Sequence, residues 1–365
     1  MRPHRPHERV ASGATTPAMT TVAGANAGRR GIVLCLLALA VSWASPAQAQ
    51  TSFVDDAGRR VQLPSRVGRV FAAGGPAEVL LYTLVPDMLA GRNRLPEGEA
   101  VEFFPPAYRN PVFIRRLPSV NDPGADAELL ALKPDVYIDY GSVHEDYIAA
   151  VEAVQRRTGI PGIILDGTLE RIPQTYRRLG HALGVGERGE RLGAAADRLL
   201  TKYRRMLSSS ASARVYLACS ADGFLPCLAD ESAGEQLAWL GGINVAGPLA
   251  TAPQRALSIE EIRALNPHVV VVAGGAGAVE RLRANHAWQS VEAVAAGRVY
   301  QAPAVPYGWG SRPPSVNRLA GVIWLSHIAA GRPFDAAFDA DIRGFYRDFY
   351  HLALTERQLR RLVAQ

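Results

Sequence analysis

The sequence predicts an α/β protein with two lobes joined by one long helix, and three observations support this. Apolar, strand-like runs alternate with helical segments of about 10–15 residues, a pattern typical of βα units and mostly parallel sheets. The order of parts in residues 128–139 (ELLALKPDVYID) returns in residues 261–272 (EIRALNPHVVVV), which indicates two lobes of related topology. Between the halves, residues 187–207 have apolar side chains at helical spacing and no proline, which predicts a rigid connecting helix.

The first 49 residues have the parts of a secretory signal peptide. Arg29 and Arg30 precede an apolar run over 32–41, and residues 47–49 read Ala-Gln-Ala. A basic region, a short apolar run and an A-x-A site predict cleavage after Ala49 and a periplasmic product. The apolar run is shorter than the roughly 20 residues that span a bilayer. Met19 is a candidate for the true start, because the residues before Arg29 fit no structural pattern.

The charge of the chain gives no reason to expect nucleic acid or a membrane surface as a partner. The formal net charge is +6. The first 50 residues hold five arginines and one glutamate, so the rest of the chain carries 35 basic and 33 acidic side chains. That near balance leaves no basic field for a polyanion. The length beyond the leader suffices for two cores.

Residues 50–186 are expected to form the N-terminal lobe, as a series of strands and helices. Strands are predicted where apolar runs end in glycine or polar loops, and helices where apolar positions follow the helical period. The expected strands lie near 67–73, 88–91, 136–138 and 162–166, and the expected helices near 76–84, 127–132 and 148–159.

Residues 187–210 are expected to form the connecting helix and residues 211–365 the C-terminal lobe with C-terminal helices. The second lobe repeats the logic of the first, as a Rossmann-like unit. Its expected strands lie near 213–218, 269–272 and 298–301, and its expected helices near 234–240, 258–265, 279–294 and from 339 onward.

Two cysteines remain after the predicted cleavage, Cys219 and Cys227. In an oxidising compartment an eight-residue spacing can close a small disulfide loop. The sequence does not give the distance between the two Cα atoms, so two free thiols or one buried thiol remain alternatives. Two cysteines alone do not make a metal site, and the histidines are scattered without ligand spacing.

Four segments carry a resemblance to a known family. They are FVDDAGRRVQLPSRVGRVFAAG (53–74), ALKPDVYIDYG (131–141), GEQLAWLGGINVAG (234–247) and LSIEEIRALNPHVVVV (257–272). In this order and spacing they resemble the periplasmic Fe-siderophore and cobalamin type of ABC transporter substrate-binding protein, whose lobes are joined by a helix. The tail from Tyr307 resembles iron-chelate members and also a molybdate- or tungstate-binding branch. The resemblance covers nearly all of the chain after the leader.

The resemblance implies a ligand in a cleft between the lobes, no catalysis, no cofactor and delivery to the permease dimer of an ABC importer. Family members dock one acidic residue of each lobe onto permease arginines. In the C-terminal lobe Glu260 matches that position, seven residues before Pro267. In the N-terminal lobe the matching position is Ala127, which departs from the pattern. Either Glu128 substitutes for it, or docking of this lobe differs, and both acids also suit helix starts.

Ligand residues are expected in loops at the carboxyl ends of the strands. In the N-terminal lobe these are Gly75, which permits close backbone approach at a helix start, Arg92 and Tyr140. An arginine suits bidentate binding of an anion, and a tyrosine can stack or donate a hydrogen bond. Each also has a structural interpretation: a tight turn, a solvated arginine and a buried tyrosine at the rim.

In the C-terminal lobe the expected ligand residues are Asp222, Phe224, Tyr307, Trp309 and Arg312. The loop PYGWGSRPP combines two aromatic side chains with an arginine, which would suit a bulky anionic complex. A rigid loop packed for structural reasons is the alternative. The expected ligand is a ferric siderophore or similar anionic metal chelate, bound by a monomer. Molybdate or tungstate, a corrinoid and haem are alternatives.

Enzyme classes find little support in the motifs. After the strand at 269–272, Gly275 and Gly277 are followed by Glu280 where a dinucleotide-binding fingerprint has its third glycine. Neither a G-x-S-x-G nor a phosphate-binding P-loop occurs. A secreted hydrolase is therefore a weak alternative. A ligand sensor with the same fold is a stronger one.

Overall fold

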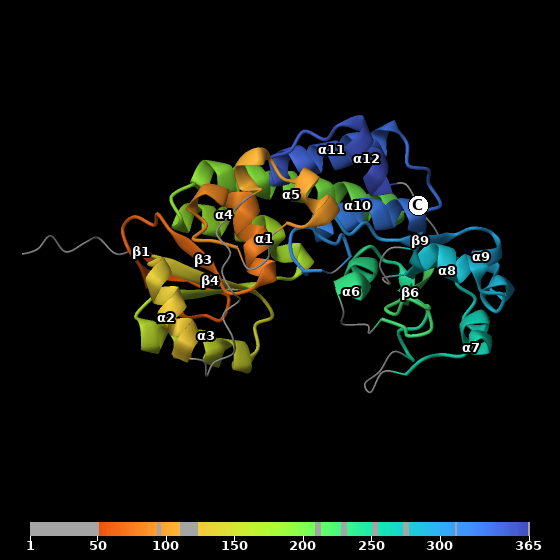
Figure 1. Cartoon of the computed structure of the whole chain (residues 1–365), viewed down its shortest axis with the longest axis horizontal. Helices are drawn as coiled ribbons and strands as arrows, with labels where there is room; N and C mark the ends of the chain where they lie inside the picture. The colour runs from red at the N-terminus through yellow and green to blue at the C-terminus, as the bar shows by residue number, and fades with distance from the viewer. Residues whose placement is uncertain are drawn as a thin grey trace, which may run out of the picture. The chain divides into compact units, whose positions relative to one another are not determined.

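The structure is a computed structural model that describes residues 51–92, 96–109, 123–208, 213–227, 232–249, 255–272, 277–310 and 312–363. The predicted signal peptide lies outside these residues. The described chain contains two parallel sheets, one in each lobe (Figure 1), in agreement with the predicted α/β class. No helix in these ranges is both long and apolar enough to cross a membrane.

The N-terminal lobe is built on a three-stranded parallel sheet in the order β3-β4-β5. An antiparallel hairpin, β1 with β2, precedes it. The predicted strand near 88–91 is reduced to a single bridge between Leu89 and Val70. The elements are β1 (Thr51–Val54), β2 (Arg60–Leu63), β3 (Val70–Ala72), α1 (Gly75–Leu84), η1 (Pro86–Met88), η2 (Gly98–Phe103), η3 (Pro106–Tyr108), α2 (Pro123–Leu132), β4 (Val136–Gly141), α3 (Glu145–Thr158), β5 (Gly162–Asp166), η4 (Leu169–Arg171) and α4 (Ile172–Ala182).

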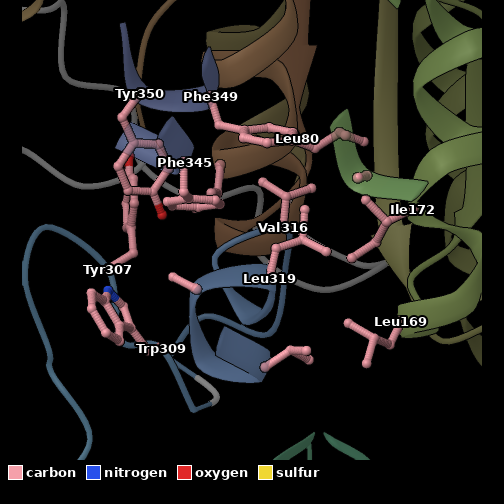
Figure 2. Packing of buried hydrophobic residues seen from close by; sticks show 14 of the residues in the cluster. Leu80, Leu169, Ile172, Tyr307, Trp309, Val316, Leu319, Phe345, Phe349 and Tyr350 are labelled. Atoms are coloured by element: carbon pink, nitrogen blue, oxygen red, sulfur yellow. The ribbon is translucent and has the colours of Figure 1, made fainter. Parts of the chain in front are cut away.

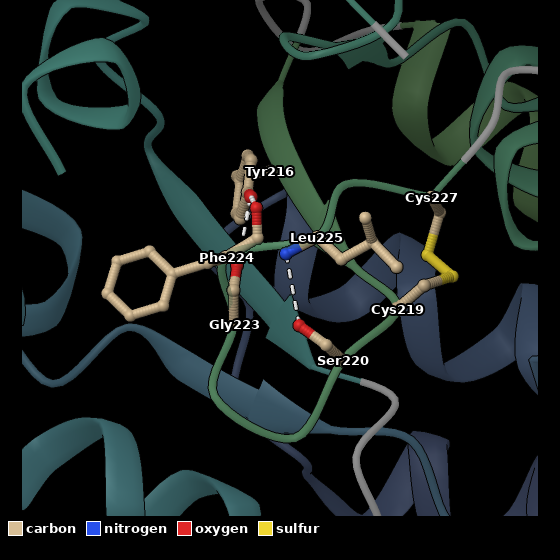
Figure 3. Close-up of a disulfide and its surroundings, with 7 residues drawn as sticks. All are labelled: Tyr216, Cys219, Ser220, Gly223, Phe224, Leu225 and Cys227. Atoms are coloured by element: carbon tan, nitrogen blue, oxygen red, sulfur yellow. Dashed lines mark hydrogen bonds between the residues drawn. A yellow bond between two sulfur atoms is a disulfide. The ribbon is translucent and has the colours of Figure 1, made fainter. Parts of the chain in front are cut away.

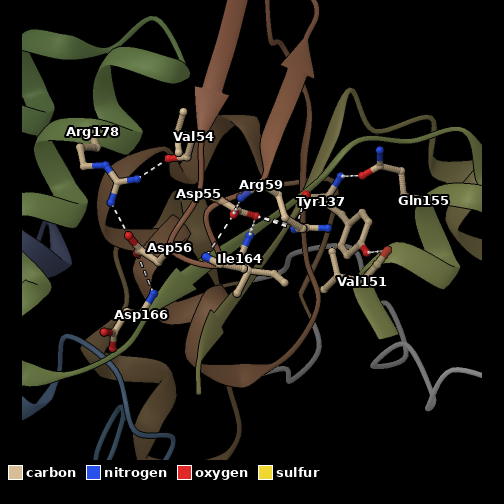
Figure 4. Close-up of polar contacts among 12 residues, drawn as sticks. Val54, Asp55, Asp56, Arg59, Tyr137, Val151, Gln155, Ile164, Asp166 and Arg178 are labelled. Atoms are coloured by element: carbon tan, nitrogen blue, oxygen red, sulfur yellow. Dashed lines mark hydrogen bonds and ion pairs between the residues drawn. The ribbon is translucent and has the colours of Figure 1, made fainter. Parts of the chain in front are cut away.

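The hairpin turn is tied to β5 by a buried carboxylate, as Figure 4 shows. Asp55 accepts hydrogen bonds from the backbone N–H of Arg59 at 2.9 Å and of Ile164 at 3.2 Å. The Arg59 guanidinium donates to the same carboxylate at 2.6 Å and to the carbonyl of Gly162 at 2.8 Å. Because charge-assisted bonds of this kind are stronger than neutral ones, the turn holds the hairpin against the sheet.

The C-terminal lobe contains a four-stranded parallel sheet in the order β7-β6-β8-β9. The predicted helix over 279–294 is wrong as a single element, because a turn around Trp288 buries that indole and interrupts the helix. The elements are β6 (Arg214–Ala218), α6 (Ser232–Trp239), β7 (Ile243–Asn244), α7 (Ile259–Ala264), β8 (Val269–Val272), α8 (Ala278–Ala284), η5 (Trp288–Ser290), α9 (Glu292–Ala295) and β9 (Val299–Gln301).

The connection between the lobes is the predicted long helix, α5 (Gly186–Ser208). It packs along α4 at close range, because glycines face each other where the helices cross. A Cβ atom at Gly189 would lie 2.5 Å from the carbonyl oxygen of Tyr176, and one at Gly180 would lie 2.7 Å from Cα of Gly189. Arg177 on α4 adds ion pairs to Glu190 and Asp197 on α5.

Three helices at the end of the chain return to the N-terminal lobe: α10 (Arg318–Ala329), α11 (Ala336–Tyr350) and α12 (Glu356–Val363). Helices α10 and α11 both pack on α5 (Figure 1). Their side chains join one apolar core that draws residues from both lobes. Figure 2 shows part of this core, in which Val316 and Leu319 lie between the aromatic side chains of α11 and Ile172 of α4.

Candidate functional site

The carboxyl ends of β4 and β5 meet helix α6 of the other lobe at a polar cluster. The strands end side by side, and the N–H of Gly167 donates to the carbonyl of Gly141 at 2.7 Å. Three residues from other segments meet this edge: Arg318 at the start of α10, Glu235 in the first turn of α6, and Leu169 in the loop after β5. We call these three residues and Tyr140 the interlobe cluster.

Arg318 is the centre of the interlobe cluster. Its side chain is 2% exposed. The guanidinium donates to the carboxylate of Glu235, to the carbonyl of Gly167 and, through Nε at 3.1 Å, to the carbonyl of Ser315. Glu235 also accepts the backbone N–H of Leu169 at 2.8 Å. One ion pair therefore joins α6, α10 and the loop after β5.

Tyr140, at the end of β4, is a member of the predicted site that the structure places beside Arg318. Its side chain is 1% exposed. Burial raises the pKa of Tyr140 to about 12, against the charge of Arg318, which lowers it. Within the described chain its hydroxyl finds no hydrogen-bond acceptor, because the guanidinium of Arg318 can only donate. A buried hydroxyl without an acceptor is costly, which makes this group a candidate for contact with a ligand.

Arg92 lies inside the protein. The side chain is 4% exposed and forms an ion pair with Glu78 on α1 at 2.9 Å. The guanidinium lies 4.5 Å from the ring centroid of Phe104 and donates to the hydroxyl of Tyr307. Burial works against its charge, but Tyr307 and Glu78 outweigh that effect and raise the pKa of Arg92. As placed here, Arg92 is a buried, ion-paired cation. Its role in ligand binding stays a prediction, because its Nη1 has no hydrogen-bond partner among the described residues and it borders a cavity of about 240 Å³.

The two aromatic residues of the PYGWGSRPP loop are also buried. Trp309 is 0% exposed, and its indole N–H donates to the hydroxyl of Tyr346 at 3.3 Å. The ring of Tyr307 packs 5.8 Å from those of Phe104 and Tyr350. The expectation that these rings form an open wall for a bulky ligand is therefore wrong for this conformation, because the loop turns them into the core.

Gly75 begins α1, and the loop that follows Arg312 packs against this end of the helix. A Cβ atom at Gly75 would lie 3.3 Å from Cβ of Pro313, and Ser315 donates from its hydroxyl to the carbonyl of Pro76 at 2.7 Å. The loop before α10 thus packs against the start of α1, and glycine permits this approach. The Arg312 side chain is exposed, so it is accessible to an anion.

The loop after β6 holds Asp222 and Phe224 in a tight turn (Figure 3). Asp222 accepts the Ser220 hydroxyl at 2.5 Å, and this hydrogen bond, opposed by slight burial, lowers the pKa of Asp222. The ring of Phe224 lies 5.4 Å from that of Trp288 and joins the second core of this lobe. Figure 3 shows it pointing to the opposite side from the disulfide. Both residues make contacts within the local structure, and their role in ligand binding stays a prediction.

Cys219 and Cys227 form a disulfide, one of the alternatives that the sequence left open, with Cα atoms 4.9 Å apart. The bond closes the same loop after β6 (Figure 3). Both cysteines line a small, mostly apolar cavity of about 60 Å³ at the carboxyl ends of β6 and β8, which Gln236 and Trp324 also border. No group of three or more metal-binding side chains occurs in the described ranges.

Both candidate docking acids are exposed. Glu128 lies on α2, and Glu260 lies in the first turn of α7. Asp126, the other acid near the expected N-terminal position, is engaged by Arg157 at 2.5 and 3.0 Å. Likewise Glu261 completes a capping box with Ser258 and pairs with Arg255. Asp126 and Glu261 thus have structural roles within their own lobes, and a docking role for Glu128 and Glu260 stays a prediction that rests on their positions and exposure.

The sequence did not reveal Glu235 and Arg318 as site residues. The signal that was present is the arginine at the head of an apolar helix, in NRLAGVIWL, where a buried charge demands a partner. The partner could not be found from sequence, because Glu235 and Arg318 are 83 residues apart and Gly167 and Arg318 are 151 apart.

Comparison with known proteins agrees with this architecture. The model of a family described as periplasmic binding protein matches residues 108–306, more than half of the chain. The chain therefore belongs to the periplasmic binding protein family. Its members are solute-binding proteins of ABC transporters and not enzymes, and membership implies a periplasmic location. None of the curated proteins matches.

Several solved structures share the fold. An ABC transporter solute-binding protein from Sulfurospirillum deleyianum is 22% identical with a TM-score of 0.75, covering 86% of this chain and 99% of its own. A periplasmic solute-binding protein from Veillonella parvula is 21% identical with a TM-score of 0.67, covering 86% and 97%. The molybdate-bound protein MolA of a Haemophilus influenzae ABC transporter is 18% identical with a TM-score of 0.62, covering 84% and 99%.

Proposed function

We propose that the protein captures a small anionic ligand in the periplasm and delivers it to the permease dimer of an ABC importer. The observation that carries the proposal is Arg318, a guanidinium held between the strand ends of one lobe and helix α6 of the other. Arg312 adds an exposed positive charge on the loop that leads to α10. Guanidinium groups match the geometry of carboxylate and other oxygen-bearing anions.

The candidate ligands differ in the kind of protein surface that they require for binding. Haem or a corrinoid needs broad apolar contact, and the aromatic rings expected to supply it, Tyr307 and Trp309, are in the core. A ferric siderophore or an oxoanion needs charge and hydrogen-bond donors, which Arg312, Arg318 and Tyr140 offer. The molybdate bound to MolA makes an oxoanion the second candidate beside the anionic metal chelate.

A titration of the secreted protein tests the ligand class. Trp239 on α6 donates to Glu170 at 2.9 Å and lies under Arg204, so its fluorescence should respond to changes between the lobes. We expect saturable binding of a ferric tris-catecholate or of molybdate, and weak or no binding of haem and cobalamin. Arg312→Ala should weaken binding of the anion by about 1–3 kcal/mol, the range for the loss of a hydrogen bond to a charged group. Tight binding of haem or cobalamin without either anion would refute an anionic ligand.

The proposal includes export through a cleaved signal peptide over residues 1–49 and function as a monomer. A secreted ligand sensor with the same fold is the alternative from another class. Uptake of the bound ligand by cells that carry the permease would distinguish the two, because a sensor binds without supporting transport.

A further inference from the structure

A carboxylate of the protein itself occupies a position suited to an external anion. Glu235 pairs through one oxygen with Arg318 and accepts the N–H of Leu169 at 2.8 Å through the other. A guanidinium and a backbone N–H are the donors with which proteins bind carboxylates, phosphates and other oxoanions. The interlobe cluster is therefore an anion site in which a side chain is the present occupant.

The burial of the two partners differs. Arg318 is almost completely buried, and Glu235 is its carboxylate partner among the described residues, whereas the Glu235 side chain is 33% exposed. The other two acceptors of Arg318 are backbone carbonyls. A buried guanidinium without a counter-charge is strongly unfavourable. Any group that replaces Glu235 must therefore bring a negative charge, and it can arrive from the solvent side.

Tyr140 supplies an independent indication of a ligand. Its buried hydroxyl finds no hydrogen-bond acceptor in the described chain, and the guanidinium of Arg318 beside it can only donate. A neutral phenol beside a guanidinium is a hydrogen-bond donor without an acceptor. Such a group is commonly explained by a ligand or water that the site accommodates.

We propose that Arg318, the Leu169 N–H and the Tyr140 hydroxyl recognise the oxygen-bearing anionic group of the ligand, and that Glu235 is an internal competitor which this group displaces. The inference rests on the proposed function and deepens it. Glu235 belongs to α6, and Leu169 belongs to the loop after β5. Displacement would therefore break a direct link between the lobes as the ligand enters, which couples binding to lobe movement.

Removal of the competing charge tests the proposal. Glu235→Gln keeps the size of the side chain and removes its charge, so Arg318 should recruit an anion from solution. We expect Glu235→Gln to bind molybdate or a ferric tris-catecholate at least about 10-fold more tightly than the wild type. We also expect saturating molybdate or phosphate to raise its melting temperature by about 2–5 °C more than that of the wild type.

The matched control is Glu170→Gln. Glu170 bridges Trp239 of α6 and Arg204 of α5 in the same region, so this change removes the same charge without touching Arg318. It should give no gain in anion affinity. The double variant Glu235→Gln/Arg318→Gln should lose the gain. Equal behaviour of Glu235→Gln and Glu170→Gln, or a gain that survives in the double variant, would overturn the proposal.

A second variant keeps the test decisive if Glu235→Gln does not fold. Glu235→Asp retains the counter-charge but is too short to reach Arg318 and Leu169 together, so a smaller gain in anion affinity is expected. An unchanged affinity would contradict competition by Glu235. The two proposals fail separately. A wild type that binds haem or cobalamin alone refutes the proposed function, whereas anion binding that is indifferent to Glu235 refutes the internal competitor.

Discussion

The side chain of Arg92 is held inside the N-terminal lobe by one carboxylate and a group of aromatic rings. Its partner Glu78 is equally buried, and the ring of Phe104 lies over the guanidinium. The position of Arg92 after an apolar run suggested a ligand-binding arginine. Its environment is set by Tyr307, 215 residues away, and no local pattern in the sequence reports such a distant contact.

Loss of Arg92 should therefore reduce stability more than ligand affinity. Arg92→Met removes the counter-charge that Arg92 gives the buried Glu78 carboxylate, so the free energy of unfolding should fall by about 3–5 kcal/mol. Urea denaturation measures the change. The double variant Arg92→Met/Glu78→Met removes both charges and should recover a large part of the loss. If Arg92→Met were as stable as the wild type but bound the ligand much more weakly, the result would instead support a role of Arg92 in ligand binding.

The elements of the protein were largely predictable, because their signals are local. The strands at β3, β4, β5, β6, β8 and β9 and the long helix α5 lie where apolar periodicity and glycine or proline turns predict them. The prediction of one helix over 279–294 was wrong, because apolar periodicity does not show that the helix is interrupted where the Trp288 side chain turns into the core. The prediction that Tyr307 and Trp309 form an open wall for a ligand was wrong for a similar reason. The direction of these side chains depends on their contacts with α11, which the sequence of the loop does not show.

The crossing of α4 and α5 gives a prediction at the scale of helices. Gly189→Ala places a Cβ atom 2.5 Å from a backbone oxygen, so the helices must separate. We expect a loss of about 1–3 kcal/mol in the free energy of unfolding, typical of an overpacked contact. Gly344→Ala in α11 is the matched control. Its nearest neighbour would be the Arg347 guanidinium at 3.8 Å, so this variant should gain about 0.5–1 kcal/mol from helix propensity. Similar stability changes in both variants would contradict the close crossing.

At the scale of the whole molecule, we expect the permease to engage both lobes. Glu128 and Glu260 are exposed on α2 and α7, at or next to the positions where the family resemblance implies docking acids. Glu128→Ala and Glu260→Ala should therefore leave ligand affinity unchanged and lower uptake, most strongly when combined. Transport assays with the permease, alongside titration of the purified variants, measure the two effects separately. Normal uptake by the double variant would rule out this docking role.

The return of α10 and α11 to the N-terminal lobe has a consequence for how the chain folds after export. Tyr82 on α1 donates its hydroxyl to the carbonyl of Tyr350, a contact that spans 268 residues. The apolar face of α1 is thus completed by a segment that is synthesised and exported long after α1 itself. Contacts between such distant residues form slowly. Until these contacts form, the apolar face of α1 is exposed to solvent. A chain truncated before α11 should therefore be degraded by periplasmic proteases.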